Sequence, residues 1–375
     1  MKFTCTKENL IKGLQITSGI ASKPSNLPIL SHIHINATDS GVELVSTNLE
    51  IAIKSYIRAK VENPGTFAIP AKTFLDYISL LHEEQVHIEL EGAQLIVSTS
   101  TSSTKIKGCS ADDYPVIPEI EETHAYTIVA EELKKAFTQV VFSVAKNEIR
   151  PELSGVYCSF FGENNPGLIL ASTDSYRLTE KKVSVDQGGD DFTCIVPGKT
   201  IGEFIRILGV TLSKTGAESN VRLWASENQI AMRYGDFEIT SRLIAGSYPD
   251  YTQIIPTDFE STAAVPGTVL INAIKAASIF TTTGVNAVMF DIDSGSSLLR
   301  VSSVSTQTGE HTTSVDAIVV GGTNAILLNH KYVLDGLQHI GADDIEFKMN
   351  GPDAPCVFKG KERDDYVYIV MPIRQ

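Results

Sequence analysis

The chain has 375 residues, a formal net charge of −14 and 42% hydrophobic residues, so it holds enough apolar material for several globular cores. Such an acidic chain argues against generic nucleic-acid binding unless its basic side chains gather on one surface. The five cysteines form no C-x-x-C pair, and no run approaches the ~20 apolar residues of a membrane span. The start of the chain shows no apolar signal core, so we expect a soluble, cytoplasmic protein with reduced thiols.

Hydrophobic periodicity and turn residues predict the same order of elements three times: strand and helix, several strands, a second helix, and more strands. In the first third we expect helices at 7–18, ending at Gly19, and 72–81, with strands at 1–6, 29–37, 41–47, 51–61, 65–69, 86–90, 94–98 and 101–109. In the second we expect a helix at 131–145 and another from Lys199, with strands at 126–129, 155–161, 168–172, 177–185, 221–225, 229–234 and 237–243. In the third we expect helices at 269–280 and from Lys331, with strands at 287–292, 297–304, 312–320, 344–349, 356–359 and 366–373.

A repeated stretch supports this order. The chain reads Ile-Pro-Ala-Lys-Thr at 69–73, Val-Pro-Gly-Lys-Thr at 196–200 and Leu-Asn-His-Lys-Tyr at 328–332. Lys72, Lys199 and Lys331 therefore align at offsets of 127 and 132 residues, about a third of the chain. We predict an α+β fold of three similar tandem domains at 1–122, 123–256 and 257–375, each with two helices packed on antiparallel sheets.

The predicted helices are the basic part of the chain. They carry nine basic and six acidic residues, a charge of about +3, whereas the strands and loops are strongly acidic. If the helices share one side of the molecule, that side is mildly basic and suited to holding phosphate without reading bases. The alternative is that these lysines are ordinary solvent-exposed residues on the helix surfaces. Because the lysine recurs in all three copies, we favour the interpretation of a basic, phosphate-holding surface.

Motifs for other chemistry fail on inspection. Gly198-Lys199-Thr200 resembles a phosphate loop, but Thr193 stands where the motif needs glycine. Asp291-x-Asp293-x-Gly295 begins like a calcium loop, yet its twelfth position is Ser302. His32 and His34 share a strand face without a further ligand at metal spacing. We expect no metal, no cofactor and no catalytic site.

Several runs, in order along the chain, resemble those of one family, the bacterial DNA polymerase III beta subunits or sliding clamps. These runs are Met-Lys-Phe-Thr at 1–4, Leu-Pro-Ile-Leu at 27–30, Thr-Asp-Ser-Tyr-Arg-Leu at 173–178, Tyr-Pro-Asp-Tyr at 248–251 and Val-Met-Pro-Ile-Arg at 370–374. The resemblance implies three clamp-fold domains per chain and a homodimeric, head-to-tail ring around double-stranded DNA. It also implies recruitment of the replicative polymerase, the clamp loader and repair proteins, without catalysis.

The resemblance implies a pocket for partner peptides between the second and third domains, with Arg177 and Arg374 as donors at its rim. Its residues would be Leu153, Thr173, Ser175, Tyr176, Arg177, Leu178, Pro249, Gln253, Ile254, Ile369, Met371, Pro372, Ile373 and Arg374. Many members have Gly-His at 175–176 and Arg at 253, so partner preference here is expected to differ.

The resemblance places the helix bases and two loops toward DNA. The DNA-facing residues would be Lys7, Lys12, Lys23, Lys72, Lys134, Lys135, Lys146, Asn147, Arg150, Lys199, Arg206, Lys275 and Lys331. Ring closure would join the edge strand holding Lys105, Ile106 and Lys107 to a third domain near Ile279, Phe280 and the strand around Leu299. Two alternatives stay open: a repeat-built hydrolase around Asp174 and Arg177, and a monomeric scaffold that binds no DNA.

Overall fold

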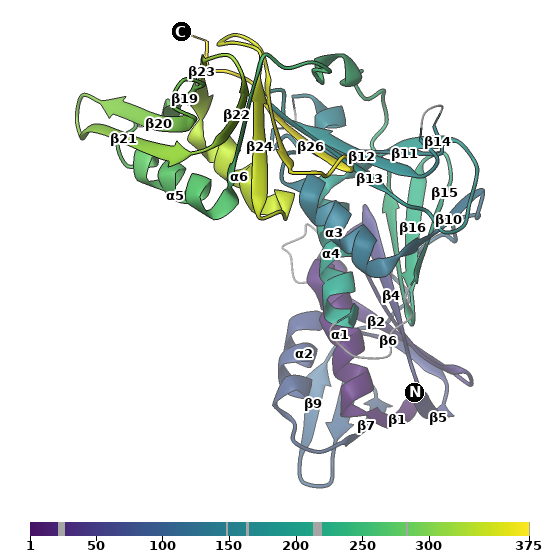
Figure 1. The fold of residues 1–375 in the computed structure, drawn as a ribbon. Helices are drawn as coiled ribbons and strands as arrows, with labels where there is room; N and C mark the ends of the chain where they lie inside the picture. The colour runs from purple at the N-terminus through teal and green to yellow at the C-terminus, as the bar shows by residue number, and fades with distance from the viewer. Residues whose placement is uncertain (22–26, 148, 163–164, 213–219, 283, 375) are drawn as a thin grey trace. The chain divides into compact units, whose positions relative to one another are not determined.

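The computed structural model describes residues 1–21, 27–147, 149–162, 165–212, 220–282 and 284–374. Within these ranges the chain forms six α-helices and antiparallel sheets, two helices to each third, which confirms the predicted α+β class (Figure 1). The helices are α1 Lys7–Ala21, α2 Ala71–Leu80, α3 Ala130–Val141, α4 Gly198–Leu212, α5 Gly267–Ser278 and α6 His330–Ile340. In the described ranges, no helix is long and apolar enough to cross a membrane.

The chain divides into two compact bodies, and the first contains Met1–Lys134, Val185–Asp190 and Lys199–Leu243. One of its sheets runs in the order β5 Ala59–Asn63, β1 Lys2–Thr6, β7 Gln85–Glu91, β8 Gln94–Ser98 and β9 Ser103–Lys107. The other runs β10 His124–Val129, β15 Asn220–Ala225, β16 Gln229–Tyr234, β17 Phe237–Arg242, β4 Ile51–Ile57, β3 Gly41–Thr47, β2 His32–Thr38 and β6 Gly65–Pro70. Helix α1 packs on β3 and β4 and beside α2 (Figure 1).

The second body contains Lys135–Ser184, Asp191–Gly198 and Ile244–Gln375. Its larger sheet runs β14 Phe192–Pro197, β11 Gly155–Phe160, β12 Leu168–Thr173, β13 Arg177–Val183, β26 Tyr366–Val370, β25 Cys356–Gly360, β24 Asp344–Met349, β18 Ser261–Pro266 and β22 Ile318–Gly321. Its smaller sheet runs β21 Gly309–Asp316, β20 Leu298–Ser305, β19 Ala287–Asp293 and β23 Asn324–Asn329. Within each body, one sheet joins strands from successive thirds, through β4–β17 in the first body and β13–β26 in the second.

A buried serine hydroxyl repeats the same hydrogen bond in all three thirds. Ser46 donates to the carbonyl of Thr17 in α1 at 2.6 Å, and Ser303 donates to Ala277 in α5 at 2.6 Å. Ser172 donates to Val140 in α3 in the same way. Each bond ties a strand to a carbonyl near the C-terminal end of a helix, and the Val140 and Ala277 carbonyls also accept the backbone N–H groups of Ser143 and Phe280. The repeat read from the sequence is therefore also a repeat of side-chain contacts.

The turn that follows each of these serines repeats as well. In the first copy the Asn48 side chain accepts the backbone N–H groups of Glu50 and Ile51, at 3.1 and 2.8 Å. In the second, one carboxylate oxygen of Asp174 accepts the N–H groups two and three residues on, at 3.0 and 3.1 Å. In the third, the Ser305 hydroxyl accepts the corresponding N–H groups at 3.3 and 3.4 Å. Short polar side chains favour such local turns.

Some predicted bounds are wrong. Gly19 does not end the first helix, which continues to Ala21; a Cβ at Gly19 would lie 2.4 Å from the Arg206 guanidinium, so packing explains this glycine. The strand expected at 29–37 starts only at His32, because Pro28–Ser31 forms a 3-10 turn. The helix expected at 131–145 ends at Val141.

The helix expected at 269–280 lies at Gly267–Ser278, and other differences lie in the strands. The strands expected at 51–61 and 312–320 are each split in two, into β4 and β5 and into β21 and β22. Strand β14 and strands β18 and β23 have no counterpart among the expected strands.

Candidate functional site

The turn between β12 and β13, in the second body, supplies four of the predicted partner-site residues. The Thr173 hydroxyl donates to the carbonyl of Arg177 at 2.6 Å and accepts the N–H of Ser175 at 3.1 Å. Ser175 has a φ of 75°, a left-handed conformation that is costly for any residue with a Cβ. This hydrogen-bonded turn holds Tyr176 outward, with 62% of the residue exposed.

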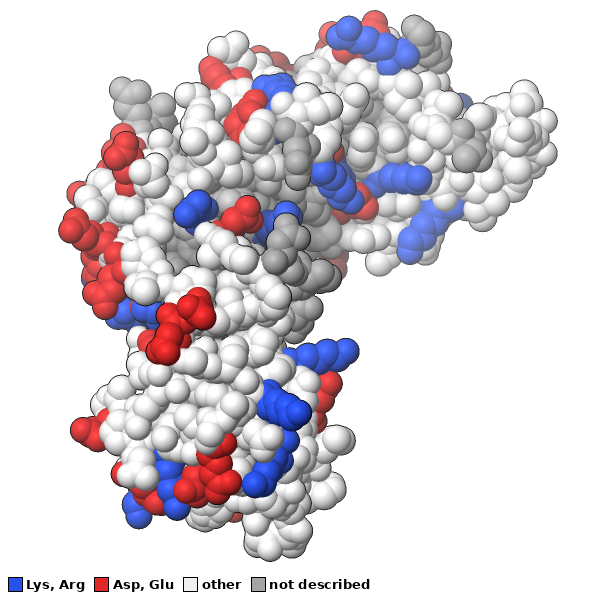
Figure 2. All heavy atoms as spheres, turned by 180° about the vertical axis from the view of Figure 1, so that it is seen from behind, with Lys and Arg blue, Asp and Glu red and all other residues white. Residues whose placement is uncertain are grey.

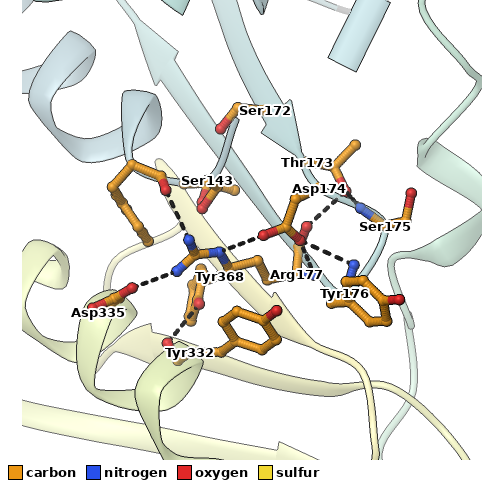
Figure 3. Close-up of polar contacts among 12 residues, drawn as sticks. Ser143, Ser172, Thr173, Asp174, Ser175, Tyr176, Arg177, Tyr332, Asp335 and Tyr368 are labelled. Atoms are coloured by element: carbon orange, nitrogen blue, oxygen red, sulfur yellow. Dashed lines mark hydrogen bonds and ion pairs between the residues drawn. The ribbon is translucent and has the colours of Figure 1, made fainter. Parts of the chain in front are cut away.

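Arg177 lies beneath this turn, and the prediction that it offers donors at the rim is wrong. Its side chain is only 5% exposed, and its guanidinium donates to Asp174 at 3.0 Å, Asp335 at 2.7 Å and the carbonyl of Phe142 at 2.9 Å (Figure 3). Burial lowers the pKa of Arg177, but Tyr368, Asp335 and Asp174 raise it by more, so the group stays charged. Arg177 joins the turn to α6 and to the end of α3.

Aromatic rings surround this guanidinium. It lies over the ring of Tyr332 at 4.8 Å and over that of Phe142 at 5.4 Å. The ring of Tyr176 is stacked on Tyr332, with centroids 6.1 Å apart, and Tyr368 donates to the Tyr332 carbonyl at 2.7 Å. Sequence reasoning did not assign Tyr332, Asp335 or Phe142 to the site, although Tyr332 and Asp335 lie in the third copy of the repeated stretch.

The predicted apolar floor is partly present. Leu178 and Ile369 pair across β13 and β26 and are 3% and 1% exposed, and Leu153 is 2% exposed. The C-terminal residues Met371, Pro372 and Ile373 are half-buried, whereas Arg374 is exposed. The N–H of Met371 donates to the Tyr176 carbonyl at 2.9 Å, which brings the C-terminal segment beside the turn.

The segment after β17 brings the remaining predicted residues to the same sheet. Tyr251 and Ile255 pack with Leu178 and Ile369 in one apolar cluster. Between them the 3-10 turn Thr252–Ile254 carries Gln253, whose amide donates to Asp250 at 2.8 Å, and Ile254, which is 38% exposed. Hydrogen bonds from Thr252 and Gln253 lower the pKa of Asp250. Pro249 is half-buried.

The repeated lysines are exposed at the second residue of their helices. Lys72 in α2, Lys199 in α4 and Lys331 in α6 share this position, and Lys135 and Lys275 are exposed as well. Lys146, Asn147 and Arg150 are exposed in the loop after α3, and Arg150 pairs with Glu152 at 3.0 Å. On the face drawn in Figure 2, basic side chains are dispersed among acidic ones. Lys23 lies outside the described residues.

Other predicted DNA-facing bases have partners inside the first body. Arg206 donates to the carbonyls of Gln15 and Ile16 at 2.9 and 2.7 Å and pairs with Glu203 at 2.7 Å. Lys7 donates to the carbonyl of Leu81, at the end of α2. The ammonium of Lys12 lies over the ring of Phe237 at 4.8 Å, and Lys134 is half-buried. Lys7 therefore also caps the end of α2, where a cation complements the helix dipole, whereas Arg206 joins α4 to the middle of α1.

The predicted dimer residues lie near strand edges. Strand β9 is at the end of its sheet; Lys107 is exposed, Lys105 pairs with Glu91 at 3.4 Å, and Ile106 is turned into the core at 7% exposure. In the second body Ile279 is 69% exposed, and Phe280 stacks on His311 of β21 at 5.6 Å. The strand holding Leu299 does not offer an edge, because β20 lies inside its sheet and β21 is outermost.

The residues of the rejected motifs serve turns and packing. Gly198 opens α4, and a Cβ there would lie 3.1 Å from both Val144 and the Ser154 carbonyl, so packing accounts for this glycine. Asp293 accepts the N–H groups of Gly295 and Ser296 at 3.0 and 3.2 Å. A search of the described residues finds no group of three metal-ligating side chains.

Three models of one protein family together match almost the whole chain. They describe the N-terminal, central and C-terminal domains of the DNA polymerase III beta subunit and match residues 1–118, 127–250 and 252–374. The chain belongs to the DNA polymerase III beta subunit family. Its function is accordingly that of a DNA sliding clamp.

Relatives of this family match along their full lengths. The beta sliding clamps of Staphylococcus epidermidis and Staphylococcus aureus are each 29% identical to this chain, over 100% of the chain and 99% of the relative. The crystal structure of the Bacillus subtilis DNA polymerase sliding clamp is 28% identical, with a TM-score of 0.92 over 100% of this chain and 99% of that one. A DNA polymerase III beta subunit structure from Thermotoga maritima is 25% identical, with a TM-score of 0.91 and the same coverage.

Proposed function

We propose that two copies of this chain close head-to-tail into a ring around double-stranded DNA, with domains at 1–122, 123–256 and 257–375. The open edges of the sheets support this most strongly. Strand β4 pairs with β17 and β13 pairs with β26, each joining one third to the next. By the repeat, β21 and β9 are the corresponding next pair, and both lie at the ends of their sheets. In a closed head-to-tail dimer, β21 of each chain would pair with β9 of the other, so neither of these edges would stay unpaired.

The repeat also predicts the register of this contact. Ile53 pairs with Ser46 in β3 and with Ile239 in β17, and Thr179 pairs with Ser172 and Tyr368 in the same way. His311, which pairs with Ser303, is the third copy of these residues. Cys109, Ile244 and Ile373 donate their N–H groups to Ala68, Ile195 and Leu327, which are equivalent in the three copies. Five residues before these donors stand Thr104, Ile239 and Tyr368, so Thr104 is the copy of the other two. Thr104 would thus face the partner's His311.

One residue along, Lys105 would face the partner's Glu310, an opposite-charge pair on the exposed side of both strands. The variants Lys105→Glu and Glu310→Lys should each weaken the dimer about tenfold or more, since each places like charges opposite one another, and the double variant should restore it. Sedimentation velocity across a dilution series measures this. A double variant as weak as the single ones would contradict the register.

We infer that the exposed helix lysines Lys72, Lys135, Lys199, Lys275 and Lys331 hold DNA without reading its sequence. The loop residues Lys146, Asn147 and Arg150 and the partly engaged Lys7, Lys12, Lys134 and Arg206 are proposed to contribute, as is Lys23. Weak phosphate contacts suffice when the ring holds DNA topologically. Protein loaded on closed circular DNA should resist competitor DNA and be lost once the circle is cut. Equal loss from both forms would contradict topological binding.

The site around Tyr176 is proposed to bind short peptides of the replicative polymerase, the clamp loader and repair proteins. The half-buried Met371 and Pro372 beside the apolar pair Leu178 and Ile369 support this proposal, because methionine adapts to varied apolar ligands. Tyr176→Ala and Met371→Ala should weaken binding of such a peptide by about tenfold. Arg58→Ala, an exposed change in the first body, is the matched control.

We infer further that the chain is a processivity factor without catalysis of its own and acts in the cytoplasm.

The hydrolase alternative would need Asp174 as a general base. Both carboxylate oxygens of Asp174 are engaged, one by two backbone N–H groups and the other by Arg177, which leaves Asp174 poorly placed for that role. Hydrolysis of a substrate that is abolished in Asp174→Asn protein would instead favour the hydrolase alternative.

A further inference from the structure

The connector between the second and third domains is held to the large sheet of the second body by tyrosines. The ring of Tyr248 is stacked on Tyr157 at 5.2 Å, and the ring of Tyr251 meets both edge-on at 6.2 and 6.3 Å. The Tyr251 hydroxyl donates to a carboxylate oxygen of Glu180 on β13 at 2.8 Å. Tyr251 is only 5% exposed and Glu180 is half-buried, so this bond is partly shielded from water.

Tyr251 also touches the floor of the proposed peptide site. Its ring packs in the cluster that contains Leu178 and Ile369. The residue directly after it opens the 3-10 turn Thr252–Ile254, which carries Gln253 and the exposed Ile254. Glu180 lies two residues beyond Leu178 on the same strand, so its side chain is on the same face of the sheet as that of Leu178. A single hydrogen bond thus fixes the connector to the strand that supplies the floor.

The first connector provides an internal comparison. It begins Tyr-Pro-Val-Ile at 114–117, where the second begins Tyr-Pro-Asp-Tyr at 248–251. Tyr114 stacks on His34 at 5.2 Å, as Tyr248 does on Tyr157, so this ring contact belongs to the shared scaffold. Ile117 stands in place of Tyr251 and Lys54 in place of Glu180, so the first copy has no equivalent bond. The Tyr251–Glu180 bond occurs only in the copy that is followed by proposed peptide-site residues.

We propose that Tyr251 and Glu180 form a positioning pair that sets the distance between the connector wall, Pro249 to Ile254, and the Leu178–Ile369 floor of the peptide site. This inference rests on the proposed peptide-binding function. Neither residue contacts the peptide. Without the bond, the wall would sample positions away from the floor, and binding would have to reorder it at the expense of affinity.

The test uses the full-length dimer and a fluorescein-labelled peptide selected on wild-type protein from a phage-displayed peptide library. Tyr251→Phe removes only the hydroxyl, and Glu180→Ala removes only its acceptor. Each should raise the Kd about five- to tenfold. Glu180→Gln keeps an oxygen acceptor and should stay within about twofold of wild type. The double variant Tyr251→Phe/Glu180→Ala should be no weaker than either single one, because the two act through one bond.

The outcomes separate the two claims. If the peptide binds wild-type protein and its Kd is unchanged in Tyr251→Phe, the positioning pair is wrong but the peptide site is not. The same conclusion follows if the losses of affinity of the two single variants add up in the double variant. Failure to select any peptide on wild-type protein would overturn the site and the pair together. General destabilisation would weaken Glu180→Gln as much as Glu180→Ala, so rescue by glutamine distinguishes positioning from mere folding. Tyr56→Phe, in the first body, controls for loss of an exposed tyrosine hydroxyl.

Discussion

Replacing Arg177 with alanine is expected to destabilise the second body by about 3 kcal/mol. Removing one member of a buried ion pair costs about 3–5 kcal/mol, mainly because its partner is left charged and buried. Here Asp335 is 50% exposed and can be rehydrated, whereas Asp174 is 16% exposed and would keep only the two backbone N–H groups that it accepts. The lower end of the range therefore applies. For a body of about 150–250 residues it corresponds to a fall in melting temperature of roughly 6–12 °C.

Calorimetry is the appropriate assay, because the only tryptophan, Trp224, lies in the first body and would not report this transition. Arg177→Lys should recover little, since an ammonium cannot reproduce the bidentate geometry that bridges Asp174 and Asp335. Arg374→Ala, an exposed arginine of the same body, should change stability by less than about 0.5 kcal/mol. A melting temperature for Arg177→Ala equal to that of Arg374→Ala would refute the reasoning.

Three further predictions follow from glycine packing, backbone strain and histidine burial. Gly336→Ala should destabilise the protein strongly, because the new Cβ would lie 1.9 Å from the Tyr368 ring. At Gly202 a new Cβ would meet no neighbouring atom within 4 Å, so Gly202→Ala should stabilise α4 by about 0.5–1 kcal/mol. Urea unfolding of both variants measures these changes. Ser175→Gly should stabilise by about 1 kcal/mol in the same assay, because glycine adopts a φ of 75° without strain, and a loss would show that the Ser175 side chain matters more. Burial lowers the pKa of His34 below its ordinary 6.5, so its contribution to folding stability is full above pH 6.5 and is lost as the pH falls. Between pH 7 and 5, the melting temperature should therefore drop more steeply for wild type than for His34→Asn. Equal slopes would contradict this.

The threefold repeat was predictable because it is written in local patterns. Lys72, Lys199 and Lys331 align in the sequence, and all three occupy the second position of their helices. Element ends were less predictable where tertiary contacts decide them. The local sequence around Gly19 predicts a helix end. In the structure Gly19 lies inside α1, where it leaves room for the side chain of Arg206, almost 190 residues away.

The site shows the same division. The resemblance identified Thr173–Leu178 and the C-terminal segment, and the structure brings them together. It gave the wrong role for Arg177, because burial beneath a turn depends on partners distant in sequence: Asp335, Tyr332 and Phe142. The repeated stretch marks Tyr332 and Asp335 as residues of a helix but does not show that they contact Arg177, so such partners are found only in the folded structure.

The three copies share one scaffold but use equivalent positions differently, which explains why the proposed partner site occurs once within the chain. Asp76, Glu203 and Asp335 occupy the same place in the repeated stretch. Asp76 is exposed, Glu203 pairs with Arg206 on its own helix, and Asp335 pairs with Arg177 from another third. The first copy of the turn has Ile51 where the second has Arg177, so it needs no acid there. The serine hydrogen bond and the capped turn are common to all three copies and stabilise the fold. The site exists because the second copy has Arg177 at this turn, which pairs with Asp335 on α6 and lies over the ring of Tyr332.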